Sequence, residues 1–529
     1  MKSLFLIAFI AIQTLLLNAQ NTNKNIDVLW SEEIKRPQGI SLETQVFDES
    51  VYVHIWHDVD ALNFVSTGSD NKVLNENRFV HEHKQEGKKS SFIDVFRFNE
   101  WLYVITSVQF EKSIIYYLQK VNPNTLIADQ GRTKLGQKLI GERSRVDIEL
   151  NVSNNYNSLF VSYTTTMIDI DMETGKMKIK RKLDYTIFDE NFEVMASKEI
   201  EPDDFGEIPF LGNVVFGKNT CVVPYAFMEM EDDNPTEPNT VLCDVIRNST
   251  ISTYSYQVEA KYKSPHRITF GKNDEVVIAG YLIPKEAKGE VKLFFISENI
   301  ADKKLNEMII NDLPEDIIKP KSVEMSKGLK KDLELKKGDT KMLDENNLTV
   351  RDIVVTENGF YLIGEVSWTP SYSVTNSQSG SLSYHNFYYN LDILVSRLDE
   401  GKLEWSNVIV KNNYRHNSYK PNRDIALNTF KFFQQNSDLY FAYNDHLNNH
   451  TNFDRNDVKK APIDGEFAVV GLTSIDSDGE LYKSLLFKKD ELELRTFEGK
   501  YSPYREYPQF FIIAQSRKNF KIATIKITE

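Results

Sequence analysis

The clearest pattern of apolar and polar positions in the chain lies between residues 350 and 411. Four runs rich in β-branched and aromatic side chains cover residues 350–355, 360–364, 392–398 and 403–410. Asn358-Gly359 separates the first two runs and Glu400-Gly401 separates the last two. Short apolar runs bounded by such turn signals are typical of antiparallel strands joined by hairpins. We therefore predict a four-stranded meander with strands a, b, c and d, and a long polar loop between b and c.

Both hairpins of this meander recur along the chain. A turn followed by an apolar strand, the a–b hairpin, precedes Val51, Trp101, Leu159, Cys221, Val276, Phe360, Leu439 and Phe510. The turns of the c–d hairpin lie at 70–71, 122–124, 189–191, 247–249, 298–304, 399–402 and 476–479. Repeats of this length built from four short strands predict an all-β fold, a β-propeller of four-stranded antiparallel blades. The repeats favour eight blades, and seven is the alternative if one repeat is degenerate.

The two ends of the chain complement each other. Residues 521–529 have the pattern of strand c and stop where strand d should begin. Residues 28–31, Val-Leu-Trp-Ser, have the pattern of the strand d at 403–406, with no a, b or c strand before them. We therefore predict that the N-terminal strand completes the C-terminal blade and closes the ring.

The meander also resembles a known family. Residues 392–405, from Asp392 through Gly401 to Trp405, resemble the c–d hairpin of secreted bacterial β-propeller repeat proteins. The resemblance implies four-stranded sheets packed radially around a channel. It implies no single activity, because function in such folds resides in sites placed on a shared scaffold.

The N-terminus has the pattern of a targeting segment. Lys2 precedes an apolar run from Leu4 to Leu17, and Ala19 is a small residue suited to cleavage. This pattern predicts a signal peptide over 1–19 and one propeller domain over 20–529, with export to the periplasm, cell surface or extracellular space. We expect no transmembrane segment beyond it and a monomer. The net charge of −14 argues against nucleic-acid binding, which needs phosphate-neutralising Lys and Arg side chains.

Only two cysteines are present, Cys221 and Cys243. They fall on two strands joined by one loop, in a chain whose predicted export would let a disulfide persist. A disulfide between them and two free thiols are both open alternatives at this point.

Several connections depart from the short turns of the repeat. Residues 314–347 are rich in Lys and predict an insertion, either a short amphipathic helix or a solvated segment. The b–c loops 229–239, 367–390 and 444–465 are also long. In a propeller the b–c and d–a connections gather on one face, and long loops on a rigid scaffold are where binding usually occurs.

The 367–390 loop combines aromatic side chains with Ser and Asn. Such a mixture suits a sugar or peptide, although the same rings would also pack the loop onto its blade. The candidate ligand-binding residues are Trp368, Tyr372, Tyr384, His385, Tyr388, Tyr389 and, in the next blade, His446.

A second candidate group is a repeated aspartate on strand a. Asp94, Asp147, Asp352 and Asp424 occupy similar places in their repeats and are expected to line the channel. They are candidates for a cation such as Ca²⁺ or for a polar ligand, although no calcium motif supports this and a Ca²⁺ site needs six to eight oxygen ligands. The alternative is that each Asp bonds the backbone of a neighbouring blade and so stabilises the repeat. His54 and His57 fall on a strand and would point to opposite faces, so they cannot bind a metal together. His81 and His83 read as solvated loop residues, so we predict no metal site.

These patterns favour a non-catalytic scaffold. The chain has no nucleophile elbow, no His-Glu-x-x-His and no phosphate-binding glycine loop. We predict a protein- or glycan-binding propeller that needs no cofactor. A hydrolase or lyase acting on an extracellular polysaccharide, with acids drawn from the channel aspartates or Asp445, and a structural component of a cell-envelope assembly are the alternatives.

Overall fold

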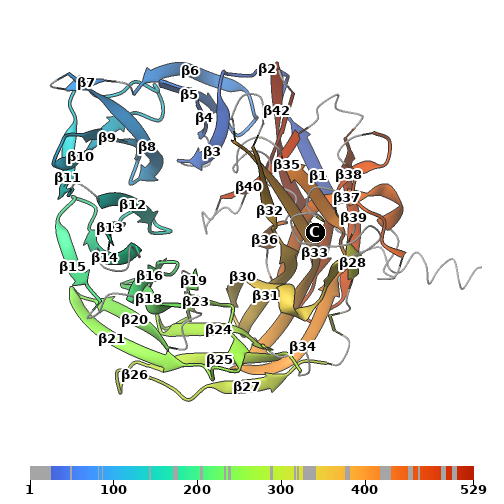
Figure 1. Cartoon of the computed structure of the whole chain (residues 1–529). Helices are drawn as coiled ribbons and strands as arrows, with labels where there is room; N and C mark the ends of the chain where they lie inside the picture. Colours follow the sequence, from blue (N-terminus) through green and yellow to red (C-terminus); the bar gives the residue numbers. More distant parts are fainter. Residues whose placement is uncertain are drawn as a thin grey trace, which may run out of the picture.

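Strands account for 68% of the computed structural model, and they form eight four-stranded antiparallel blades arranged in a ring (Figure 1). The predicted fold class, including eight blades rather than seven, is confirmed. The structure describes residues 25–47, 51–81, 83–85, 87–141, 144–170, 177–202, 207–231, 234–235, 240–285, 290–314, 317–318, 321–323, 325, 330, 341–375, 382–417, 430–435, 437–450, 457–462, 465–489, 496–502, 509–516 and 518–528. The predicted signal peptide lies outside these residues.

Each blade is a meander whose first strand lies innermost in the ring (Figure 1). Blade one contains β3 (Ile40–Val46), β4 (Tyr52–His57), β5 (Ala61–Thr67) and β6 (Val73–Val80). Blade two contains β8 (Lys88–Phe98), β9 (Trp101–Gln109), β10 (Ser113–Val121) and β11 (Thr133–Leu139), with β7 (Lys84–Gln85) at its edge. Blade three contains β12 (Ser144–Val152), β13 (Leu159–Ile170), β14 (Met177–Phe188) and β15 (Val194–Ile200). Blade four contains β16 (Glu207–Leu211), β17 (Val215–Phe216), β18 (Thr220–Glu231), β19 (Asn234–Pro235), β20 (Thr240–Arg247) and β21 (Thr250–Gln257).

The second half of the ring follows the same order. Blade five contains β22 (Tyr262–Lys263), β23 (His266–Phe270), β24 (Val276–Pro284), β25 (Lys292–Asn299), β26 (Lys304–Leu305) and β27 (Ile309–Asp312). Blade six contains β30 (Leu348–Thr356), β31 (Gly359–Trp368), β32 (Ser371–Thr375), β33 (Leu382–Asp399), β34 (Lys402–Ile409) and β35 (Asn413–Asn417). Blade seven contains β36 (Lys431–Gln435), β37 (Asp438–His446), β38 (Ala468–Ile475) and β39 (Leu481–Lys488), with the short helix η2 (Leu447–Asn449) after β37.

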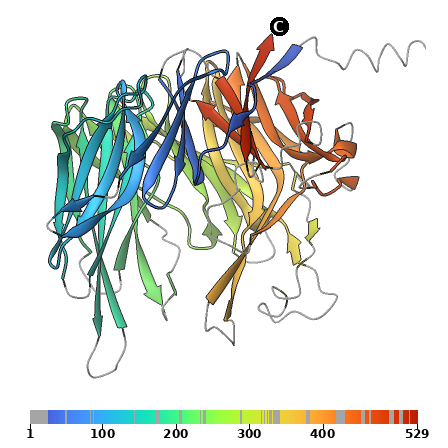
Figure 2. The same ribbon diagram turned by 90° about the horizontal axis from the view of Figure 1, so that it is seen from above.

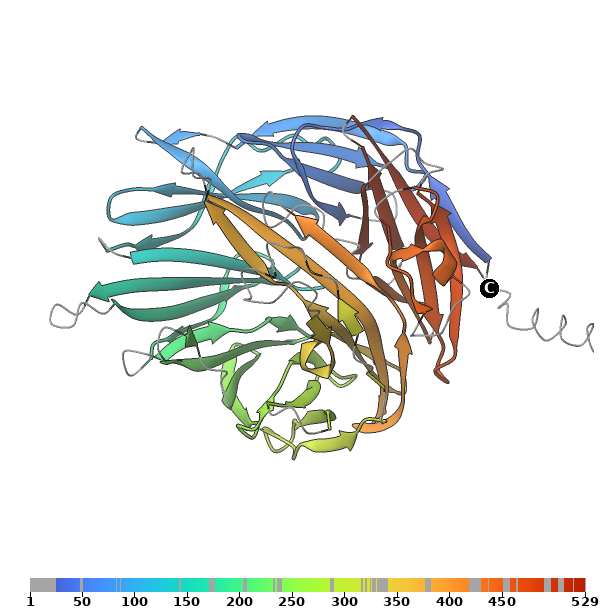
Figure 3. The same cartoon turned by 45° about the vertical axis from the view of Figure 1, so that its right-hand side comes forward.

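Blade eight is built from both ends of the chain. Strands β40 (Thr496–Ser502), β41 (Gln509–Gln515) and β42 (Asn519–Thr528) are completed by β1 (Asn25–Trp30). β1 runs antiparallel to β42 with Val28 opposite Ile525 and Trp30 opposite Ala523, and β2 (Ile34–Lys35) extends the pairing. Figure 3 shows the blue β1 beside the red strands of the C-terminal end. The predicted ring closure is confirmed.

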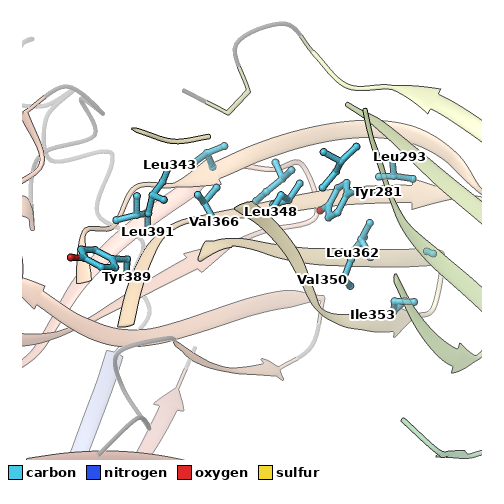
Figure 4. Packing of buried hydrophobic residues seen from close by; sticks show 14 of the residues in the cluster. Tyr281, Leu293, Leu343, Leu348, Val350, Ile353, Leu362, Val366, Tyr389 and Leu391 are labelled. Atoms are coloured by element: carbon cyan, nitrogen blue, oxygen red, sulfur yellow. The ribbon is translucent and has the colours of Figure 1, made fainter. Parts of the chain in front are cut away.

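The core consists of eight apolar clusters, one in each interface between neighbouring blades. Blade faces are apolar on both sides because every blade is covered by two neighbours. The cluster between blades five and six, shown in Figure 4, includes Tyr281, Leu293, Leu362 and Leu394. This radial packing fixes the orientation of each blade and therefore of the loops that it carries.

The Gly and Trp of the 392–405 segment have a structural role. Glu400 and Gly401 both have positive φ, 46° and 84°, as a tight hairpin turn requires. Trp405 donates its indole N–H to the carbonyl of Ser477, 3.1 Å away, and its ring lies against Gly479 in the next blade's c–d turn. Trp405, one of the residues that carry the family resemblance, therefore joins blade six to blade seven.

Two details differ from the sequence prediction. Strand c of blade six begins at Leu382, so much of the expected polar loop is strand. The ends of the 314–347 insertion pair as β28 (Lys321–Val323) and β29 (Lys341–Leu343), followed by the short helix η1 (Glu345–Asn347). Residues 371–375 and 382–390 are rich in Ser, Asn and Tyr, and β28 and β29 are only three residues long each, so neither pair of strands shows the apolar run that predicts a strand.

The blade-three b–c hairpin is a long one. β13 and β14 pair without interruption from Leu159 to Ile170, and the hairpin projects from the ring (Figure 2). Within the described residues, no helix is long and apolar enough to cross a bilayer.

Candidate functional site

The most elaborate part of the ring is an extension of blade six. Beyond the blade itself, β33 pairs with β32 on one side, with Tyr372 opposite His385 and Ser373 opposite Tyr384. On its other side it pairs with β35, with Tyr389 opposite Tyr414. We call residues 367–375, 382–390 and 413–417 the blade-six arm. Pairing with β32 and β35 fixes the backbone of β33 beyond the blade.

Three further segments pack against the base of this arm. Val323, Met325 and Leu343 of the 314–347 insertion belong to the same buried cluster as Phe387, Tyr389 and Leu391, and Figure 4 shows Leu343 beside Leu391. The connection after β34 joins it through Val410, and Val458 of the blade-seven loop packs against it. The Ala461 N–H also donates to the carbonyl of Asn412, 2.9 Å away. We call the arm together with residues 321–323, 341–343, 410–412 and 445–462, where described, the six–seven platform.

The predicted aromatic residues take different places on the platform. The ring of Trp368 stacks on Tyr389 at 5.3 Å, and Tyr389 lies 4.8 Å from Tyr414. Tyr389 is buried, whereas Trp368 and Tyr388 are half-buried. Lys460 lies over the Tyr414 ring at 3.9 Å. These contacts support the packing interpretation for Tyr389, and Trp368 and Tyr388 are each only partly covered by the protein.

Of the remaining predicted platform residues, three are placed only by their backbone and His446 is placed by two contacts. Tyr372, Tyr384 and His385 lie on the paired strands of the arm, and their side chains are outside the described part of the structure. His446 stacks on Phe467 at 5.2 Å, and its Nδ1 accepts the Asn448 N–H. His446 therefore caps the short helix η2. A ligand role for these four residues stays a prediction.

A buried network of charges lies beneath the arm. The fully buried Glu365 accepts hydrogen bonds from both Arg351 and the equally buried Lys411. Asp392 accepts from the Nζ of Lys321 at 2.6 Å and from the backbone N–H of Lys411 at 3.1 Å. Burial lowers the pKa of Lys411, and the neighbouring Glu365 opposes this shift. The network ties blade six to the insertion, and sequence reasoning missed it because the five residues come from separate elements.

A related group lies in blade seven. Asp445 is buried and accepts from Asn449 Nδ2 at 2.7 Å and from the His446 N–H at 2.8 Å. Burial raises the pKa of Asp445, and it lowers the pKa of both His450 and Lys483. Titratable groups moved from their ordinary pKa values are common at functional sites, although structural ion pairs produce the same shifts.

The strand-a aspartates share a local geometry. Asp94 and Asp352 each follow a β-bulge, and each carboxylate accepts the N–H of the next residue at 2.8 Å. Both touch solvent, yet the protein atoms crowded around the inner strands raise their pKa through desolvation. This bond lies within the aspartate's own strand, whereas the expected alternative was a bond to the backbone of a neighbouring blade.

The aspartates do not form one group in the described structure. Asp147 pairs with Arg145 at 2.7 Å, and Asp424 lies outside the described residues. Burial raises the pKa of Asp94, and the Val95 N–H lowers it. Burial also raises the pKa of Asp352, and the Ile353 N–H and Arg267 lower it. Within the described ranges, no three His, Cys, Asp or Glu residues are grouped to hold a metal ion.

The structure contradicts a disulfide between the two cysteines. Cys221 lies opposite Ile246 and Cys243 lies opposite Pro224 on the paired strands β18 and β20. Cys221 packs toward blade three and Cys243 toward blade five, on opposite faces of blade four. Both thiols are free and buried, and burial raises the pKa of each. Strand alternation explains this result, because side chains on opposite faces of a sheet cannot meet.

The prediction that the loop histidine His81 is solvated is wrong, and the strand residue His54 is buried as well. His54 is fully buried between Thr44 and Thr67, and His81 is 3% exposed. The Nε2 atoms of His57 and His81 lie 3.2 Å apart. The sequence places these residues 24 positions apart, and only the register of β4, β5 and β6 reveals that they meet.

Comparison with known proteins adds distant structural similarities. No protein-family model and no curated protein matches the chain. Polysaccharide lyase Uly1 aligns over 84% of this chain and 94% of its own at 8% identity, with a TM-score of 0.33. A mutant of Synechocystis apocarotenoid oxygenase aligns over 89% of this chain and 95% of its own at 9% identity, with a TM-score of 0.30. The endo-arabinase from Bacteroides thetaiotaomicron aligns over 54% of this chain and 95% of its own at 10% identity, with a TM-score of 0.21. TM-scores this low carry no argument about function.

Proposed function

We propose that this chain is an exported, non-catalytic β-propeller that binds a protein or a glycan through the six–seven platform. The observation that carries the proposal is the shared core of the platform. Three parts of the chain that depart from the short turns of the repeat, the insertion, the arm with the adjoining residues 410–412, and the blade-seven loop, pack at one buried cluster with blade six. Extra chain held this firmly on a rigid scaffold is typical of a binding surface. The leader pattern of residues 1–19 supports export.

The half-buried aromatic side chains allow a direct test. We expect Trp368→Ala and Tyr388→Ala to weaken the binding of a glycan or protein ligand by about tenfold or more, as truncation of interface aromatics does. Tyr262→Ala is the matched control, because Tyr262 is also half-buried but lies in blade five. A purified ligand identified on a glycan array or by affinity capture would be titrated by calorimetry against each variant. Equal affinity in wild type, both platform variants and the control would contradict the proposal.

A second candidate, a polysaccharide hydrolase or lyase, is favoured by one observation. The buried carboxyl of Asp445, with its raised pKa, lies close enough to His450 and Lys483 to influence the pKa of both. Acids and bases of this kind carry out glycosidic cleavage when they reach the substrate. Release of reducing ends or of unsaturated products from a polysaccharide, lost in Asp445→Asn, would support this candidate over the scaffold.

A further inference from the structure

Three basic side chains lie on the innermost strands of three consecutive blades. Arg267 belongs to β23 of blade five, Arg351 to β30 of blade six and Lys431 to β36 of blade seven. The Nε of Arg267 lies 3.4 Å from the carbonyl oxygen of Arg351. All three are half-buried, so each is partly desolvated and still reachable from solvent. Figure 1 shows β30 and β36 beside each other around the centre of the ring.

Glu365, the carboxylate bonded to Arg351, already has two cationic partners. Glu365 accepts from Arg351 through one oxygen and from Lys411 through the other. Lys411 also lies over the ring of Phe430, the neighbour of Lys431, at 5.5 Å from its centroid. Glu365 therefore carries one negative charge against two cations, before Arg267 and Lys431 are considered.

Arg267 and Lys431 lack an ion pair in the described part of the chain. Asp352 is close enough to Arg267 to influence its pKa, but no carboxylate of the described residues lies within the 4.0 Å of an ion pair from either cation. Burial lowers the pKa of both cations, and like-charge repulsion from Arg351 lowers it further. With Lys321 and Asp392, which belong to the same network, five cations stand against the three carboxylates of Glu365, Asp352 and Asp392, in a protein whose net charge is −14. Grouped cations with too few anions cost stability, and proteins retain such arrangements chiefly where a ligand supplies the missing charge.

We propose that Arg267, Arg351 and Lys431 bind the acidic group, a carboxylate or a sulfate, of a saccharide ligand. This inference rests on the proposed binding function and specifies its ligand as an acidic glycan. The two guanidinium groups have the planar donor geometry that suits oxyanions, and Lys431 adds a compact charge. A small acidic group fits the position better than a folded partner, because half-buried side chains on inner strands cannot provide the roughly 800 Å² per partner that a stable protein interface buries.

The test compares matched sugars and matched variants. Wild type, Arg267→Gln/Lys431→Gln and the control Lys402→Gln would be titrated with D-glucuronate, D-glucose 6-sulfate and neutral D-glucose at constant ionic strength, by ligand-observed NMR. Lys402 is exposed in the c–d turn of blade six, away from the three cations. We expect one or both acidic sugars to bind wild type and the control at least about tenfold more tightly than D-glucose does, and the double variant to lose this preference. The two acidic sugars distinguish a carboxylate from a sulfate as the recognised group.

The melting temperature provides a second measurement that a purely structural cluster would not reproduce. If the cations serve to bind a ligand, the Lys431→Met variant should melt at the same temperature as wild type or higher. The substitution removes a half-buried charge that has no ion-pair partner among the described residues. A lower melting temperature for Lys431→Met would assign the lysine a structural role and overturn the inference. Equal binding of acidic and neutral sugars, or an unchanged preference in the double variant, would also overturn it. Loss of binding in Trp368→Ala alone would then leave the platform proposal standing.

Discussion

At the scale of single residues, the most consequential feature is the buried pair of Lys411 and Glu365. Both side chains are fully buried, and neither residue was a candidate from the sequence, in which Lys411 follows an apolar run and precedes two Asn. Taking two charges out of water costs several kcal/mol per ion, and the cost is offset only when both partners are present. The pair therefore makes the base of the arm depend on a specific partnership rather than on apolar burial alone.

Removing one member of this pair should be costly. We expect Lys411→Met to lower the free energy of unfolding by about 3 kcal/mol, because Glu365 then keeps a buried charge with only Arg351 to balance it. Chemical denaturation monitored by tryptophan fluorescence would measure the loss. Lys411→Met combined with Glu365→Gln should recover part of it, since the uncompensated carboxylate is gone. If Lys411→Met were as stable as the exposed-site control Lys402→Gln, the buried pair of Lys411 and Glu365 would not stabilise the fold in this way.

At the scale of elements, the sequence predicted turns better than strand lengths. Turns such as Asn99, Asn248 and Glu400-Gly401 carry positive φ, a local requirement that residue type reveals directly. The extension of β33 back to Leu382 was missed because its strand is polar and depends on β32 and β35 as partners. Pairing of this kind is a long-range property, as is the meeting of His57 with His81. The sequence identifies the candidate aromatic residues, but it does not predict which of them are buried and which are accessible.

We expect the rigidity of the arm to depend on Tyr389. Tyr389 stacks between Trp368 and Tyr414 and is buried in the cluster that joins the arm to the insertion. Tyr389→Ala should therefore destabilise the protein by about 3 kcal/mol or more, the usual cost of removing a buried aromatic ring. Amide hydrogen exchange should rise in β32 and β35 and stay unchanged in blade two. Unchanged exchange in the arm would show that the ring does not hold it in place.

At the scale of the whole molecule, closure of the ring was the prediction that depended least on local detail. It followed from two incomplete repeats at the two ends of the chain, and the register of β1 with β42 confirms it. The number of blades followed in the same way, from counting hairpins. The location of the charged network could not be predicted in this way, because it depends on how Glu365, Asp392 and Lys411 are brought together by the blades and the insertion.

Closure by a terminal strand makes the stability of the ring depend on the N-terminus. A chain that begins at Arg36 would lack β1 and β2, and would leave the edge of β42 unpaired. Val28 and Trp30 would no longer cover the apolar cluster between blades seven and eight, a loss of about 3 kcal/mol or more. An unpaired strand edge is also a template for association, so size-exclusion chromatography with light scattering should detect dimers or larger species. The control begins at Asn25 and keeps both strands. If the shorter chain stays monomeric and melts at the temperature of this control, the terminal strand does not hold the ring closed.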